Sequence, residues 1–160
     1  MKKYFLKAAV VLFGVSFMTS CKGNKKATDQ EVLKYLPGTW KLAEEVDDEG
    51  EITTVKQDIL LTFGKEGENV PEGQGSTSSI AGKFSMQVDG KTMVTNGRWN
   101  IEYDYDDPGV LLYCHNDYGQ IITFPDGESF FFIVTINSSK MKVITDEYSD
   151  EGYILHRVVK

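Results

Sequence analysis

The sequence contains few of the residues that build catalytic and metal centres. Its 160 residues include two histidines and two cysteines, whereas a zinc site needs three or four convergent ligands. It has no G-x-S-x-G elbow, phosphate-binding loop, dinucleotide fingerprint or H-E-x-x-H helix. Acidic residues are abundant, but nothing sets one pair apart for two-acid hydrolysis. We therefore expect no enzyme activity, no catalytic residue, no metal and no cofactor.

Cys114 and His115 are neighbours, which invites a metal or nucleophile interpretation. Adjacent residues of a strand point to opposite faces, so these two side chains cannot converge on one ion. Cys114 shares its side of the strand with Val110 and Leu112, and we expect it to be a small buried hydrophobe. Both residues are predicted to be structural.

The acidic run over residues 102–107 resembles part of a calcium loop. In an EF-hand loop that starts at Asp104, Gly109 takes the required sixth position. The twelfth position needs a bidentate Glu, and here it is His115. Strand alternation explains the run better, with the acids on the solvated face and the aromatic residues on the other.

Long hydrophobic runs are also absent. The apolar stretch Ala8–Met18 is too short to span a bilayer, and it lies between a basic start and small residues, the order of an export signal. Residues 17–21 (Phe-Met-Thr-Ser-Cys) resemble a bacterial lipobox, with Met18 in place of the usual Leu. We predict a lipoprotein signal peptide over residues 1–20 and lipidation of Cys21. The alternative is an ordinary cysteine behind a conventional cleavage site.

The predicted lipid would anchor the protein to a membrane without spanning it. Each buried lipid methylene contributes about 0.8 kcal/mol, so the three chains of a bacterial lipoprotein hold stably. Residues 21–27 form a basic tether of roughly 20 Å at most. Lipoproteins sent to the cell surface in Bacteroidota, which this chain resembles at its start, often carry an acidic run after the lipid cysteine. That run is missing here, and we expect a cell-envelope protein at the outer membrane, facing the periplasm.

Processing also changes the charge and the cysteine count. The full chain carries −7, and loss of three signal-peptide lysines takes the mature part to −10. This charge argues against nucleic acid and anionic lipid surfaces as partners. With Cys21 lipidated, Cys114 has no partner for an internal disulfide.

A short helix is predicted at the start of the folded domain. Thr28 and Glu31 have the spacing of a capping box, in which each side chain bonds to the other residue's amide. Apolar residues at 32, 33 and 36 form a stripe, and Pro37 stops the helix. We expect this helix to cover one end of the domain.

From Gly38 onward, apolar and polar residues alternate as they do in half-buried strands. The segments are separated by turn signals such as Asp89-Gly90 and Pro108-Gly109, and residues 65–79 are predicted to form a long loop. The expected strands cover residues 38–46, 57–64, 83–88, 98–105, 110–115, 121–124, 129–137, 140–146 and 152–159. Closure would remove the two unpaired edges of such a meander. We predict an all-β fold, an antiparallel up-and-down β-barrel of eight or nine strands with a short N-terminal helix, over residues 28–160.

Residues at the two ends of the domain resemble a known family. Gly38-Thr39-Trp40 opens the first strand after a short helix, and Arg157 lies in the last strand. In these respects the chain resembles the lipocalins, and in particular the lipocalin-like lipoproteins of Bacteroidota. The resemblance implies that Trp40 lies at the closed end of the barrel and that Arg157 packs over it. Physical reasoning agrees, because the first and last strands must pair and a guanidinium can stack on an indole.

Two classes of function are open. In the first, the barrel binds a small apolar or aromatic ligand in a cavity lined by side chains that share the inner face. The residues assigned to this ligand site are Phe63, Phe84, Met86, Trp99, Ile101 and Tyr103. In the second, these side chains fill the barrel themselves, and the protein is an interaction module, such as an envelope inhibitor or assembly factor.

Overall fold

The domain opens with the expected helix. The computed structural model describes residues 26–67, 80–102, 108–123, 130–146, 148 and 150–159. Helix α1 (Asp29–Tyr35) follows the N-cap residue Thr28, whose side chain accepts a hydrogen bond from the amide of Glu31, while the Glu31 carboxylate accepts one from the amide of Thr28. The capping box is therefore confirmed.

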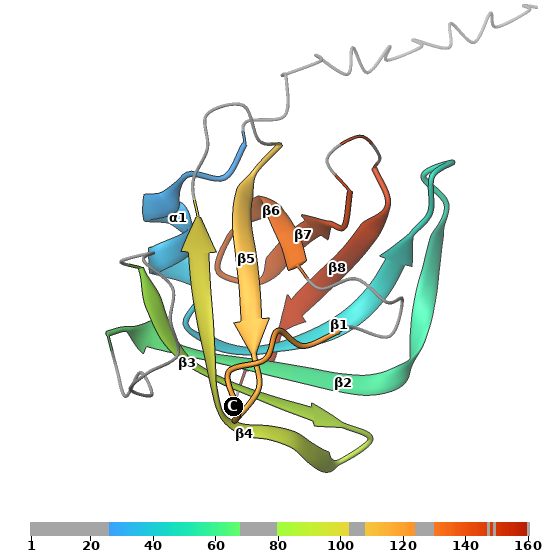
Figure 1. Cartoon of the computed structure of the whole chain (residues 1–160). Coiled ribbons are helices and arrows are strands. Elements are labelled where there is room, and N and C mark those ends of the chain that lie inside the picture. Colours follow the sequence, from blue (N-terminus) through green and yellow to red (C-terminus); the bar gives the residue numbers. More distant parts are fainter. Residues whose placement is uncertain are drawn as a thin grey trace, which may run out of the picture.

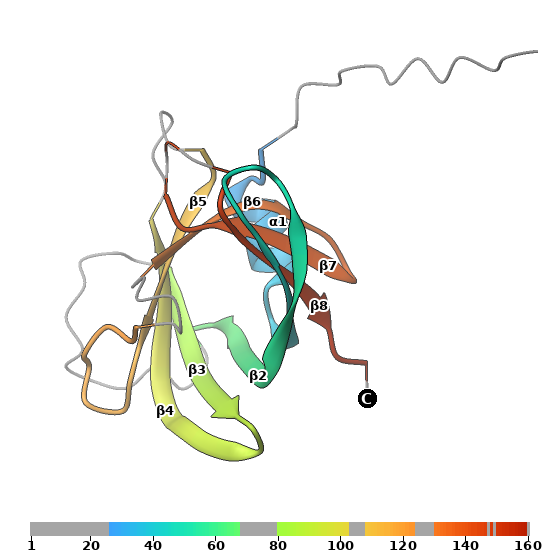
Figure 2. The same cartoon turned by 90° about the vertical axis from the view of Figure 1, so that its right-hand side faces the viewer.

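A closed barrel follows the helix, as Figures 1 and 2 show from two sides. Each strand pairs antiparallel with the next, and β1 pairs with β8 to complete the circle. Its strands are β1 (Gly38–Val46), β2 (Ile52–Glu66), β3 (Ala81–Val88), β4 (Lys91–Glu102), β5 (Val110–His115), β6 (Phe130–Ile136), β7 (Lys140–Ile144) and β8 (Gly152–Arg157). The prediction of an all-β, up-and-down antiparallel barrel is confirmed, with eight strands in the described part of the chain.

The barrel has two distinct ends. The helix end contains α1, the start of β1 and the end of β8. The far end contains the end of β1 and the start of β8, which pair with each other. The β3–β4 hairpin extends away from α1 and lies apart from the end of β1 in both views (Figures 1 and 2). That hairpin turns at Asp89 and Gly90, which both have positive φ angles, of 50° and 75°. Two such residues make the type I′ turn that matches the twist of the paired strands.

The strand boundaries differ from expectation most clearly in three places. β2 begins at Ile52 and includes Lys65 and Glu66, which are expected in the long loop; residues 68–79 lie outside the described residues. β4 begins at Lys91, before the expected start at residue 98. The expected strand at 121–124 is wrong in its described part, because residues 121–123 make one isolated bridge, from Ile121 to His115.

The polar side of β4 is also different from expectation. Alternation places Arg98 and Asn100 on a solvated face, yet both are buried, and Asn100 is only 2% exposed. Its amide oxygen lies 2.7 Å from Nε2 of His115 on β5, so this buried polar group has a partner across the strands. A buried amide is tolerated when it is hydrogen-bonded. The alternation of apolar and polar residues along β4 does not reveal such a bond.

Candidate functional site

At the helix end, two residues far apart in the sequence, Trp40 and Arg157, meet where β1 pairs with β8. Trp40 is fully buried, and its indole nitrogen donates to the carbonyl oxygen of Leu36 at 2.8 Å. The guanidinium of Arg157 lies over the Trp40 ring, 4.4 Å from its centre. It also donates to the carbonyl oxygens of Pro37, at 2.8 Å, and Tyr35. The structure thus brings Trp40 and Arg157 together where sequence and resemblance put them.

Gly38 is required by this arrangement. Its φ angle is +133°, which residues with a side chain rarely adopt. A Cβ atom at this position would lie 2.0 Å from Nη1 of Arg157. The guanidinium therefore occupies the space that only glycine leaves empty, and the partial burial of Arg157 lowers the pKa of its guanidinium by desolvation.

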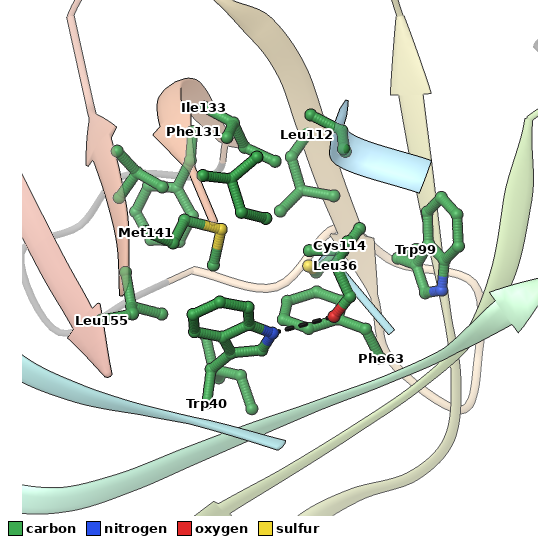
Figure 3. Close-up of a cluster of buried hydrophobic side chains, with 14 of the residues drawn as sticks. Leu36, Trp40, Phe63, Trp99, Leu112, Cys114, Phe131, Ile133, Met141 and Leu155 are labelled. Carbon is green, nitrogen blue, oxygen red and sulfur yellow. Dashed lines mark hydrogen bonds between the residues drawn. The ribbon is translucent and has the colours of Figure 1, made fainter. Parts of the chain in front are cut away.

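The side chains assigned to a ligand cavity lie inside the barrel. Phe63, Phe84, Trp99 and Ile101 are at most 2% exposed, and they belong to one contiguous core that also includes Trp40 and residues of α1. Figure 3 shows the middle of this core. Met86 is partly buried and packs against the same core, and Tyr103 lies outside the described residues.

Contacts between these side chains are direct. The rings of Phe63 and Phe84 are 5.3 Å apart and tilted by 46°, which is a favourable aromatic geometry. The indole nitrogen of Trp99 donates to the carbonyl oxygen of Gly64 at 3.0 Å. Surfaces that are almost fully inaccessible leave no room beside them for a water molecule. The described interior is therefore occupied by the protein's own side chains.

Cys114 and His115 divide between the two faces of β5. Cys114 is buried in the core, 1% exposed, and burial raises the pKa of its thiol far above the usual range. His115 faces the other way, with Nε2 close to Asn100 and Nδ1 3.2 Å from the carbonyl oxygen of Gly119. The thiol therefore stays protonated, and the imidazole braces the turn that follows β5.

At the far end, a pocket of about 190 Å³ lies between the end of β1 and the start of β8. Its lining residues are Glu45, Val46, Asp47, Thr145, Glu151, Gly152 and Tyr153. Glu45 and Tyr153 are directly opposite each other in the β1–β8 ladder, so their side chains share one face. The pocket is smaller than the roughly 300–1,000 Å³ of small-molecule sites.

Charge in the two chain segments at this pocket is mostly negative. Every charged residue in segments 44–51 and 145–151 is Asp or Glu, although Lys142 on β7 lies 3.8 Å from the carboxylate of Asp150. Among the described residues, no group of three or more His, Cys, Asp or Glu is arranged to hold a metal ion. The carboxylates are thus spread around a hollow instead of meeting at a point.

Sequence reasoning missed this pocket. The segments around Asp47 and Asp150 each have the composition of a solvated turn, and no local pattern connects one with the other. Two signals could have predicted it. Both turns lack Lys and Arg, and closure of the barrel places the end of β1 beside the start of β8.

No described helix is both long and apolar enough to cross a membrane. Comparison with protein-family models, with curated proteins and with solved structures found no match to this chain.

Proposed function

We propose that the protein is a lipid-anchored interaction module of the cell envelope. In this proposal a filled, lipocalin-like barrel is a rigid scaffold that presents its loops and acidic surface to another protein. The observation that supports it is the packed interior, in which four of the six side chains assigned to a ligand cavity are almost fully inaccessible. Side chains that are almost fully inaccessible already contact protein atoms on all sides, which supports a filled barrel over a ligand cavity.

Lipidation of Cys21 would hold the module at the outer membrane, facing the periplasm. The support is the order of basic start, apolar stretch and lipobox-like ending in residues 1–21. The first described residues are fixed to the barrel, since the amide of Ala27 donates to the carbonyl oxygen of Val134 in β6 at 2.7 Å. The short predicted tether would therefore keep the barrel close to the lipid surface.

The rival function, storage or transport of a small apolar ligand, needs space inside the barrel. Exposed side chains fit the interaction module better, because Tyr118, which follows β5, and Tyr148, between β7 and β8, are each 89% exposed. Tyrosine is enriched in protein interfaces and contributes large contact area.

In-cell photo-crosslinking tests this proposal. A photoreactive phenylalanine analogue is placed at Tyr118 or Tyr148 of the full lipoprotein, with exposed Lys140 at the helix end as the matched control. The proposal expects light-dependent adducts with a protein from positions 118 and 148 and fewer from position 140. Absence of protein adducts, together with one lipid molecule retained per chain in native mass spectrometry, would favour the ligand-binding barrel instead.

A further inference from the structure

We infer that the far-end pocket is a recognition site for a basic side chain, arginine or lysine, presented by a partner protein. This inference rests on the proposed function and names the surface and the partner's chemistry. The far-end pocket combines three features: acidic walls, an aromatic wall and a hydroxyl group that has no partner. Each feature is a contact that a guanidinium or ammonium group uses.

The acidic wall comes from both sides of the β1–β8 seam. Glu45 and Asp47 lie on one side and Glu151 on the other. One oxygen of Asp47 already accepts hydrogen bonds from the amides of Glu49 and Glu51, at 3.1 and 2.7 Å. Glu45 is exposed on β1, which makes its carboxylate the one best placed to meet a cation that enters from outside.

The aromatic wall is Tyr153. It is 5% exposed and is held from behind by Phe131, whose ring lies 6.0 Å away in an edge-to-face arrangement. An aromatic side chain at the edge of an acidic hollow attracts a cation through its ring as well as through the nearby carboxylates.

Thr145 supplies the third feature. It lines the pocket and is only 8% exposed, and its hydroxyl makes no hydrogen bond to another residue in the described part of the chain. Among the described residues, the fully buried side-chain N and O atoms that lack a hydrogen bond do not include the Thr145 oxygen, so this oxygen is accessible from the pocket. A donor that enters the pocket would satisfy the Thr145 oxygen, and a guanidinium carries five N–H donors in a fixed fork.

Size and charge select the kind of occupant. The volume of about 190 Å³ suits one inserted side chain, and the dispersed carboxylates suit an organic cation with several donors more than a bare metal ion. The surrounding segments 44–51 and 145–151 contain only acidic charged residues, and of these Asp150 lies 3.8 Å from Lys142; the remaining carboxylates would attract a partner with a basic surface. Exposed Ile52 pairs with Val46 of the pocket lining and would contact apolar atoms beside the basic residue.

The test titrates the mature chain carrying Cys21→Ser with N-acetyl-arginine amide at low ionic strength and follows backbone amide shifts by NMR. N-acetyl-citrulline amide, which has the same shape without the charge, is the matched control ligand. We expect arginine amide to shift the amides around Thr145 and Tyr153 with an affinity of about millimolar. We expect citrulline amide to leave them unchanged.

Three variants assign the effect to the pocket. Glu45→Gln should weaken arginine binding about two- to fivefold. Glu44→Gln makes the same charge change one residue earlier, opposite the outward-facing Ile154, and should leave binding unchanged. Thr145→Val should weaken binding, whereas Thr145→Ser, which keeps the hydroxyl, should retain it.

Several results would overturn the inference. They are equal shifts with citrulline amide, equal losses from Glu44→Gln and Glu45→Gln, or no shifts at the pocket up to the solubility limit of arginine amide. Free spermidine binding more tightly than an arginine-containing hexapeptide would point to a polyamine site and would contradict a protein partner. Arginine binding without any protein adduct in the crosslinking experiment would contradict the proposed function and support the cation site. Protein adducts without arginine binding would support the proposed function and contradict the cation site.

Discussion

Replacing Arg157 tests whether the barrel is held closed at the helix end. Arg157 stacks on Trp40 and donates to the carbonyl oxygens of Pro37 and Tyr35. A desolvated cation–π contact is worth about 2 kcal/mol, and a hydrogen bond from a charged group about 1.5–3 kcal/mol. Because Arg157 is only partly buried and the carbonyls can be rehydrated, we expect Arg157→Ala to lower the free energy of unfolding by about 2–4 kcal/mol.

Substitution of Trp40 supplies the second half of the argument. Loss of a buried Trp costs about 3–5 kcal/mol, so Trp40→Ala should destabilise more than Arg157→Ala. Arg157→Lys keeps the charge but loses the guanidinium fork that reaches both carbonyl oxygens. It should therefore lower the free energy of unfolding by less than Arg157→Ala does. Because the two residues touch, the double variant should lose about 0.5–3 kcal/mol less than the sum of the single losses.

The assay is urea unfolding followed by far-ultraviolet circular dichroism, which does not depend on tryptophan fluorescence. With m about 1–3 kcal/mol per M, a loss of about 3 kcal/mol lowers the midpoint by about 1–3 M. His156→Ala, an exposed neighbour on β8, is the control and should change the free energy by less than about 0.5 kcal/mol. Strictly additive losses at Trp40 and Arg157 would refute the closure argument.

Four further outcomes are expected, the first three from the structure and the last from the sequence. Gly38→Ala should cost at least about 2 kcal/mol in the same urea assay, because it combines a strained φ with a clash against Arg157; a wild-type midpoint would contradict this. Cys114 should resist thiol reagents in the folded protein, since burial raises its pKa, and rapid labelling in buffer would be the contrary result. Its contribution to stability should be complete below about pH 8.5 and should fall by about 1.4 kcal/mol per pH unit above it, where only the unfolded thiol ionises, and Cys114→Ala should lack this slope. Cys21→Ser should move the protein from the membrane to the soluble fraction, and a wild-type protein with an unmodified N-terminus by mass spectrometry would exclude lipidation.

Much of the fold was predictable because its signals are local or periodic. The capping box at Thr28 and the turn at Asp89-Gly90 are short-range patterns with a single geometric outcome. Alternation along each strand assigns Trp99 and Ile101 to the interior, where they lie. The contact between Trp40 and Arg157 is long-range, but barrel closure forces the first and last strands together and makes it foreseeable.

Other features depend on contacts between neighbouring strands, which the alternation of residues along one strand does not reveal. The buried amide of Asn100 is satisfied by a hydrogen bond with His115 on the neighbouring strand, and no pattern within β4 reveals that partner. Whether Phe63 and Phe84 line a cavity or fill it is decided by how closely the opposite walls approach, which is a property of the whole core. The far-end pocket likewise exists only after two distant acidic turns are brought together.

The central claim is that the barrel is filled by its own side chains. The most direct test titrates the mature Cys21→Ser chain with a fluorescent fatty-acid analogue, and follows both ligand emission and the quenching of the buried tryptophans. The filled barrel predicts no saturable binding up to high micromolar concentrations and no displacement by cell lipid extract. Saturable binding at micromolar or better affinity, about −8 kcal/mol, with displacement by a natural lipid, would contradict it.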